Sequence, residues 1–184
     1  MQELAQHTAY RLLESGPVVM VSTRHHGHNN VMTMGFHMML QHRSAQIACV
    51  IGPWDHSYEA MVETGECVIA IPTVDLAEKV VDIGNCSGHD VDKFSRFSLT
   101  ALPASIVSAP LIAECLANLE CQVVDTSCLD RYNLFILRVR KIWFDASREE
   151  QRTLHHCGDG EFIVGEKRID LGERMVLWQH LSNK

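Results

Sequence analysis

The chain has 184 residues, of which 46% are hydrophobic and 21% are charged, and these proportions are typical of one globular domain with a sizeable core. Its formal net charge is −7 at pH 7. Because a protein that binds nucleic acid needs a basic surface, this acidic balance argues against nucleic acid as a partner.

We expect a cytoplasmic protein without a membrane partner. The first residues lack the pattern of a signal peptide, and no apolar run has the length that crosses a bilayer. The seven cysteines are odd in number, and no pair has the Cys-x-x-Cys spacing of a zinc or redox motif. Cys49, Cys67 and Cys121 lie in apolar runs typical of strands. We therefore expect reduced, mostly buried cysteines, which suit a reducing cytosol.

The first predicted elements are a helix and three strands. An apolar stripe predicts an amphipathic helix over residues 1–15, ended by Gly16 and Pro17. Residues 18–23 form an apolar run that predicts a buried strand, and residues 32–40 are its expected hairpin partner. The link between them contains Gly27 and three histidines. Residues 47–51 predict a third strand.

Two helices are predicted in the middle of the chain. Asp55 or Ser57 can cap a helix that runs to Thr64, with Gly65 after its end. Residues 67–71 predict a strand, which Pro72 stops. A second helix follows and ends near residue 84; its expected buried side chains are Leu76, Val80 and Ile83. Residues 85–110 are expected to form a loop, with a short helical turn over residues 91–97.

The second half of the chain predicts further strands. In residues 117–123 apolar side chains alternate with Asn118, Glu120 and Gln122, which is typical of a half-buried strand. Residues 135–140 alternate in the same way, and the tail predicts a hairpin between residues 162–164 and a strand at Ile169. At least six strands with few long crossovers favour a mostly β, antiparallel barrel. We expect one domain over residues 1–184, with a leading helix (1–16) and a C-terminal extension (146–184).

The stretch from Asn29 to Leu40 follows neither the strand nor the helix pattern over a useful length. It holds four methionines, and Gly35 lies in its middle. A glycine within a strand-like run often marks a close approach to the backbone. Methionine fills irregular apolar gaps, which can hold a flat ring. The residues alone leave two interpretations open, a sulfur-rich core strand and a ring-binding wall.

An ordered set of short motifs carries a resemblance to a known family. The set comprises Asn30-Val31-Met32-Thr33, Gly52-Pro53-x-x-x-Ser57-Tyr58, Thr64-Gly65-Glu66, Ser87-Gly88-x-Asp90-x-Asp92-Lys93-Phe94, residues 109–115, Leu119-Glu120-Cys121 and residues 133–136. From about Pro17 to Asp145, the chain resembles the flavin reductase-like family, whose members include flavoredoxins. The resemblance implies an FMN-binding split β-barrel with a few short helices, and a homodimer with flavin near the subunit interface.

The resemblance also implies where FMN would bind. It assigns ring contacts, mostly through backbone groups, to Met32, Thr33, Met34, Gly35 and Phe36, and direct hydrogen-bonding side chains to Asn30 and His37. Two departures are evident: many relatives have serine at the position of Gly35 and arginine at the position of Asp55. The second departure places a negative charge near the expected phosphate.

The FMN phosphate needs local compensation because the protein is acidic. The start of the helix at Ser57 offers free backbone N–H groups, and His56 can add a donor. Lys93 is a second candidate, next to the loop that contains Ser87. The alternative interpretation makes Ser57 an ordinary helix cap and Lys93 a solvated surface charge.

The eleven histidines include a cluster at residues 25, 26 and 28. Such clusters bind zinc or nickel adventitiously, but a mobile turn provides few groups to fix the ligands. We therefore expect no structural metal. No local motif selects a catalytic Cys–His pair either.

Three functional hypotheses follow. The first is an FMN oxidoreductase that passes electrons from NADH or NADPH to a small-molecule or protein acceptor; since the flavin does the chemistry, the catalytic residues are unknown. The second is a flavoredoxin-type electron carrier without its own nicotinamide site. The third is a split-barrel protein that has lost flavin. The sequence does not distinguish NADH from NADPH, bound flavin from substrate flavin, or one acceptor from another.

Overall fold

The computed structural model describes residues 16–41, 44–167 and 169–174. The predicted leading helix over residues 1–15 lies outside the described residues. Within them, one antiparallel sheet of seven strands dominates, and its strand order is β2-β1-β5-β8-β9-β4-β3. Its strands are β1 (Val19–His25), β2 (His28–Met34), β3 (His37–Gln41), β4 (Gln46–Val50), β5 (Glu66–Ile71), β8 (Ala117–Asp125) and β9 (Leu134–Phe144).

Short helices and two small sheets surround this sheet. The helices are α2 (Ser57–Thr64), α3 (Ala77–Gly84), α4 (Lys93–Arg96) and α5 (Leu129–Tyr132), and short 3-10 turns lie at η2 (Val74–Leu76) and η3 (Gly172–Arg174). The small sheets pair β6 (Ala101–Leu102) with β7 (Leu111–Ile112), and β10 (Leu154–Gly158) with β11 (Glu161–Val164). No helix among the described residues combines the length and apolar character that spanning a bilayer requires.

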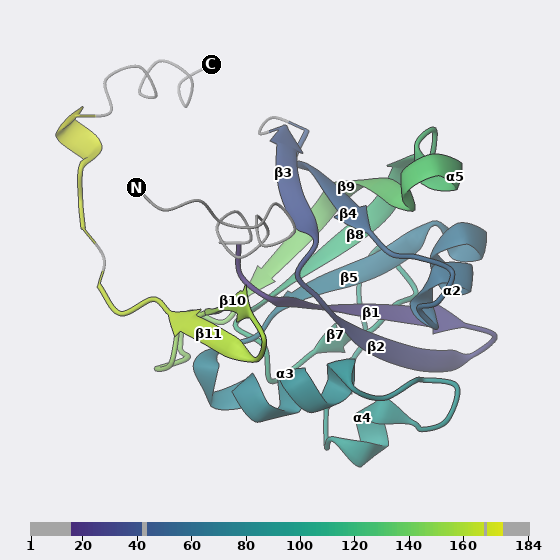
Figure 1. Cartoon of the computed structure of the whole chain (residues 1–184), viewed down its shortest axis with the longest axis horizontal. Helices are drawn as coiled ribbons and strands as arrows, with labels where there is room; N and C mark the ends of the chain where they lie inside the picture. Colours follow the sequence, from purple (N-terminus) through teal and green to yellow (C-terminus); the bar gives the residue numbers. More distant parts are fainter. Residues whose placement is uncertain (1–15, 42–43, 168, 175–184) are drawn as a thin grey trace.

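The sheet closes into a barrel through a covalent link. β2 and β3 are the two end strands of the sheet order, yet only Gly35 and Phe36 separate them in the chain. The sheet must therefore curl until its two ends meet (Figure 1). The Val50 N–H donates to the Phe36 carbonyl oxygen at 3.0 Å, which attaches the link to β4. A mostly β, barrel-like fold is confirmed.

Strand β1 is buried on both faces. Val19 and Val21 point into the barrel, where they pack with Phe135 and Leu137. Met20 points the opposite way, into a second apolar cluster that lies beneath α3 and α4. This double burial explains why residues 18–21 form a continuous apolar run and not an alternating one.

Most predicted elements are confirmed. Helix α2 is followed by Gly65 in the left-handed conformation. Helix α3 has Leu76 just before it and Val80 and Ile83 on its buried face. All seven cysteines are free. The predicted side-chain cap of α2 is wrong: His56 precedes the helix and makes no side-chain cap hydrogen bond. Asp55 accepts a hydrogen bond from the Gly52 N–H instead, at 2.9 Å.

Two strand predictions were wrong. Residues 32–40 do not form one strand, because the chain leaves β2 after Met34 and enters β3 at His37, at the other end of the sheet. In the tail, β11 pairs with the preceding strand β10 and not with a strand at Ile169. Asp159 and Gly160, both at positive φ, provide the two-residue turn of that hairpin.

The alternation predicted for residues 117–123 fails at two polar residues, since Asn118 and Glu120 are buried. The Glu120 carboxylate accepts hydrogen bonds at 2.5 to 3.1 Å from the backbone N–H groups of Ser105, Ile106 and Val107 and from the Trp143 indole. Burial acts to raise the pKa of Glu120, but these donors together lower it below its usual value. One carboxylate therefore holds a whole loop against the barrel.

We predict that Glu120→Gln lowers the free energy of unfolding at pH 7 by about 1–3 kcal/mol, because an amide cannot accept from all four donors. A lowered pKa means that the carboxylate stabilises the fold above its unfolded pKa of about 4.3, and that this stabilisation disappears as the pH falls. Urea unfolding from pH 7 to pH 3 should therefore show the two proteins converging. The exposed Glu161→Gln serves as the control and should match the parent throughout. A difference between Glu120→Gln and the parent that stays constant with pH would contradict this account.

Candidate functional site

A pocket of about 240 Å³ lies where β2 faces the start of α2, the end of α3 and the loop after it. Six of the predicted site residues line it: Asn30, Met32, Thr33, His56, Ser87 and Lys93. The other lining residues are Trp54, Asp55, Ile83, Gly84, Asn85, Cys86 and Gly88. The fold thus brings together side chains from three segments that are distant in the sequence.

Asn30 connects these segments. Its side chain is 8% exposed, and its Nδ2 donates to the Ser57 hydroxyl oxygen at 2.9 Å. The backbone at Gly88 packs directly against it, since a Cβ built on Gly88 would lie 2.1 Å from Asn30 Oδ1 and 2.6 Å from His56 Cδ2. Only glycine permits this approach, so the loop after α3 is fixed onto β2 and the start of α2.

Thr33 anchors β2 to α3. Its hydroxyl donates to the Val80 carbonyl oxygen at 2.6 Å. A Cβ on Gly84 would lie 3.3 Å from the Thr33 Cβ, so the end of α3 also packs closely here. The floor of the pocket is therefore rigid.

Lys93, one of the two predicted phosphate contacts, is buried beside the pocket. The side chain is 4% exposed and not a solvated surface charge. Its Nζ donates to the Ile83 carbonyl oxygen at 2.9 Å. Burial lowers the pKa of Lys93, while the nearby Cys86 and Asp55 act in the opposite direction. An ammonium has three N–H donors, and a buried one beside a pocket is suited to an anionic ligand.

Asp55 and Trp54 were not predicted as site residues, although the sequence drew attention to the charge of Asp55. Asp55 lines the pocket and is half-buried, so its carboxylate opposes an anion there. Trp54 is 74% exposed, and its ring covers Gly52 so closely that a Cβ would lie 2.2 Å from a ring atom. The turn at residues 52–55 could have been read from Gly52 and Pro53, but the position of the indole could not.

Five predicted site residues do not line this pocket. Met34 points into the barrel core, and Ser57 is fully buried behind Asn30. The His37 ring lies 2.7 Å from the Pro17 carbonyl oxygen, and Phe36 is 60% exposed beside Gly35. Gly35, Phe36 and His37 therefore belong to the link and the edge strand that follow the pocket wall.

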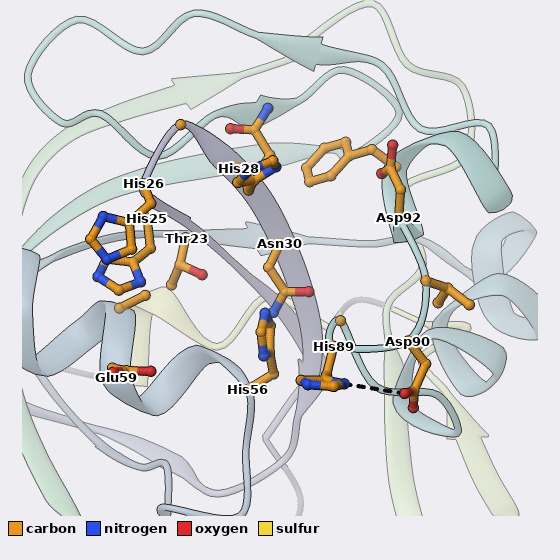
Figure 2. A pocket seen from close by; sticks show the side chains of 16 residues that line it. Thr23, His25, His26, His28, Asn30, His56, Glu59, His89, Asp90 and Asp92 are labelled. Carbon is orange, nitrogen blue, oxygen red and sulfur yellow. Dashed lines mark hydrogen bonds and ion pairs between the residues drawn. The ribbon is translucent and has the colours of Figure 1, made fainter.

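A second pocket, of about 660 Å³, adjoins the first and shares Asn30, His56 and Gly88 with it. Figure 2 shows its polar lining, which includes five histidines: His25, His26, His28, His56 and His89. The rings of His56 and His89 meet edge to face with centroids 6.4 Å apart. Glu59, Asp90 and Asp92 add carboxylates around the same space.

The fold is similar to those of an FMN-binding domain and of a flavoredoxin whose structures are solved. The chain belongs to the flavin reductase like domain family, whose model matches residues 11–162. The protein YddH of Escherichia coli (strain K12) is 28% identical over 180 residues, which cover 90% of this chain and 95% of that protein.

Two solved structures show the same fold. One is an FMN-binding domain of a flavin reductases-like enzyme from Shewanella baltica OS155, with a TM-score of 0.79, 25% identity, and coverage of 91% of this chain and 95% of that chain. The other is the flavoredoxin of Desulfovibrio vulgaris (Miyazaki F), with a TM-score of 0.83, 20% identity, and coverage of 96% and 100%.

Proposed function

We propose that this protein is an FMN-binding oxidoreductase that takes electrons from NADH or NADPH and passes them to a small-molecule or protein acceptor. The observation that carries the proposal is the buried Lys93 ammonium, which lies beside a polar pocket formed by three segments. Family membership supplies the reason to regard that pocket as a flavin site. The free cysteines suit a reducing cytosol, so a cytoplasmic location is part of the proposal.

The residues of the pocket fit the phosphate end of FMN. Lys93 provides a desolvated positive charge, and Ser87 and His56 add polar groups around it. Asp55 opposes an anion, but its carboxylate already accepts a hydrogen bond from the Gly52 N–H. The pocket is smaller than the roughly 300 Å³ at which ligand sites usually begin, so it would hold the phosphate and part of the chain attached to it.

The flat ring would then extend from the pocket along the wall that begins at Met32 and continues to the exposed Phe36. Backbone groups and small or apolar side chains in this segment would position the ring and restrict water. Bound FMN supplies the acceptance of hydride from nicotinamide and the onward transfer of electrons. Among the described pocket residues we assign none as a general acid or base.

The second candidate function is a flavoredoxin-type carrier without its own nicotinamide site, which the fold of the Desulfovibrio vulgaris flavoredoxin favours. A split barrel without flavin is a further alternative, because the carboxylate of Asp55 in the pocket opposes a bound phosphate.

Two measurements on the purified protein test the function. The flavin released on denaturation of one sample is identified, and oxidation of NADH or NADPH is measured on another sample that has not been denatured. We predict about one FMN per chain, retained through desalting, and oxidation of NADH or NADPH by the protein alone. FMN retention without nicotinamide oxidation would favour the carrier function. A colourless protein that also fails to take up added FMN would contradict both and favour the flavin-free alternative.

For Lys93, we predict that Lys93→Met weakens FMN binding about ten- to more than a hundredfold, because a charge-assisted contact contributes roughly 1.5–3 kcal/mol. Methionine retains an apolar stem of similar length, so the flavin-free variant should still fold. Lys167→Met removes an exposed lysine and should leave the affinity unchanged. FMN titrations at low and high salt, with circular dichroism of the flavin-free proteins, provide the measurement. Equal FMN affinities for the parent and Lys93→Met would indicate that Lys93 does not hold the phosphate and that the phosphate binds at the start of α2.

We also propose a homodimer in which a second copy covers strand β3. Four apolar side chains are exposed on this strand and on the link before it, Phe36 (60%), Met38 (60%), Met39 (53%) and Leu40 (46%), and patches of this kind mark interfaces. We predict that the double variant Met38→Glu/Met39→Glu shifts a dimer to a monomer in sedimentation at micromolar concentration. Ile163→Glu, at an equally exposed apolar residue on β11, should remain a dimer. A monomeric parent with flavin bound would contradict the proposal.

A further inference from the structure

The turn between β1 and β2 is held rigidly. His26 and Gly27 occupy its two central positions with φ of 49° and 83°, the positive values that a tight type I′ hairpin turn requires. Strand pairing continues to the turn itself, where His25 lies opposite His28. The expectation that no metal binds here assumed a mobile turn, but the structure shows a fully paired hairpin.

Helix α2 places a carboxylate against this turn. His25 Nε2 and Glu63 Oε2 are 2.7 Å apart, across 38 residues of sequence. The rings of His25 and His26 lie next to each other (Figure 2), and their centroids are 3.9 Å apart. One ligand atom from each of His25, His26 and Glu63 lies within 4.8 Å of the other two. Spacing in the sequence could not reveal this group, because Glu63 comes from a different element.

We propose that His25, His26 and Glu63 bind one divalent first-row transition-metal ion of the zinc class. Two imidazole nitrogens and one carboxylate oxygen form a donor set that zinc takes in open sites, where a fourth position is left for water or a ligand. Zinc–ligand bonds of about 2.0–2.2 Å separate neighbouring ligand atoms by roughly 3.4 Å in a tetrahedral site. The His25–Glu63 separation of 2.7 Å is shorter than that value, and no two of the three ligand atoms are more than 4.8 Å apart, so modest side-chain rotations suffice.

The surroundings favour such an ion over a simple ion pair. The Glu63 side chain is 51% exposed and His26 is exposed, so both can rotate toward a common centre. An ion bound to His25 Nε2 and the Glu63 carboxylate would replace the hydrogen bond between these two side chains. It would join the tip of the hairpin to the last turn of α2, at the rim of the pocket that His25 and His26 line. The proposal does not depend on flavin binding.

The test is a Zn²⁺ titration of the full chain without a histidine tag, by calorimetry against a chelator of known affinity. We expect one tight site per chain, and at least about tenfold weaker binding in His26→Ala and in Glu63→Gln. Co²⁺ gives a second readout, since a four-coordinate site produces intense visible absorption that both variants should lose.

Matched controls lie in the same two elements. His28→Ala removes a histidine on the other strand of the hairpin, and Glu59→Gln removes a carboxylate one turn earlier in α2. Both should bind Zn²⁺ as the parent does. Equal weakening in the controls and in the two ligand variants, or only weak binding of several ions, would show adventitious binding to the many histidines and would overturn the proposal. Repeating the titration with flavin-free and flavin-loaded protein separates this result from the fate of the flavin proposal.

Discussion

The rest of the structure depends on the two-residue link between β2 and β3. Because the first and last strands of the seven-stranded sheet are neighbours in the chain, the sheet must curl. Curling separates an inner core, which contains Met34 and Phe135, from an outer cluster that α3 and α4 cover. The candidate pocket is lined by Asn30, Met32 and Thr33 of β2, which come shortly before the link. The strand that leads into the link therefore also forms one wall of the site.

The pocket is held in shape by a few buried or half-buried polar contacts, each between two different elements. Asn30 donates to Ser57, Thr33 to the Val80 carbonyl and Lys93 to the Ile83 carbonyl. Such bonds are stronger in a low-dielectric interior than in water, and an unpaired partner is costly, so the contacts fix one arrangement of the segments. The absence of a side chain at Gly88 is part of the same arrangement. A ligand that binds here meets groups that are already in place, which reduces the entropy cost of binding.

Much of this fold could be predicted from the sequence, because strands and helices that bury one face have a regular apolar period. Prediction failed where the period was not set by burial alone. Residues 32–40 span two strands that face different neighbours, so no single period describes them. Glu120 was assigned to the solvent face of its strand because charged residues are usually exposed; only its partners, in a loop and on the neighbouring strand, justify its burial. Lys93 was predicted as a phosphate contact, but its burial and its hydrogen bond to the Ile83 carbonyl oxygen were not predicted. The site residues on β2 and in the loop at Ser87 were predicted from the family motifs and not from any local pattern. Nothing in the sequence predicted the position of the Trp54 indole.

The acidic composition and the proposed anion site are compatible because they act over different distances. Charges spread over the surface of a protein with net charge −7 are screened within about 10 Å at moderate salt. A buried ammonium such as that of Lys93 is screened far less, and its attraction for a phosphate in contact is correspondingly larger. The net charge therefore argues against a long polyanion such as nucleic acid, which must meet many surface charges at once. It has little bearing on a single phosphate that enters one polar pocket, where the local balance between Lys93 and Asp55 decides the affinity.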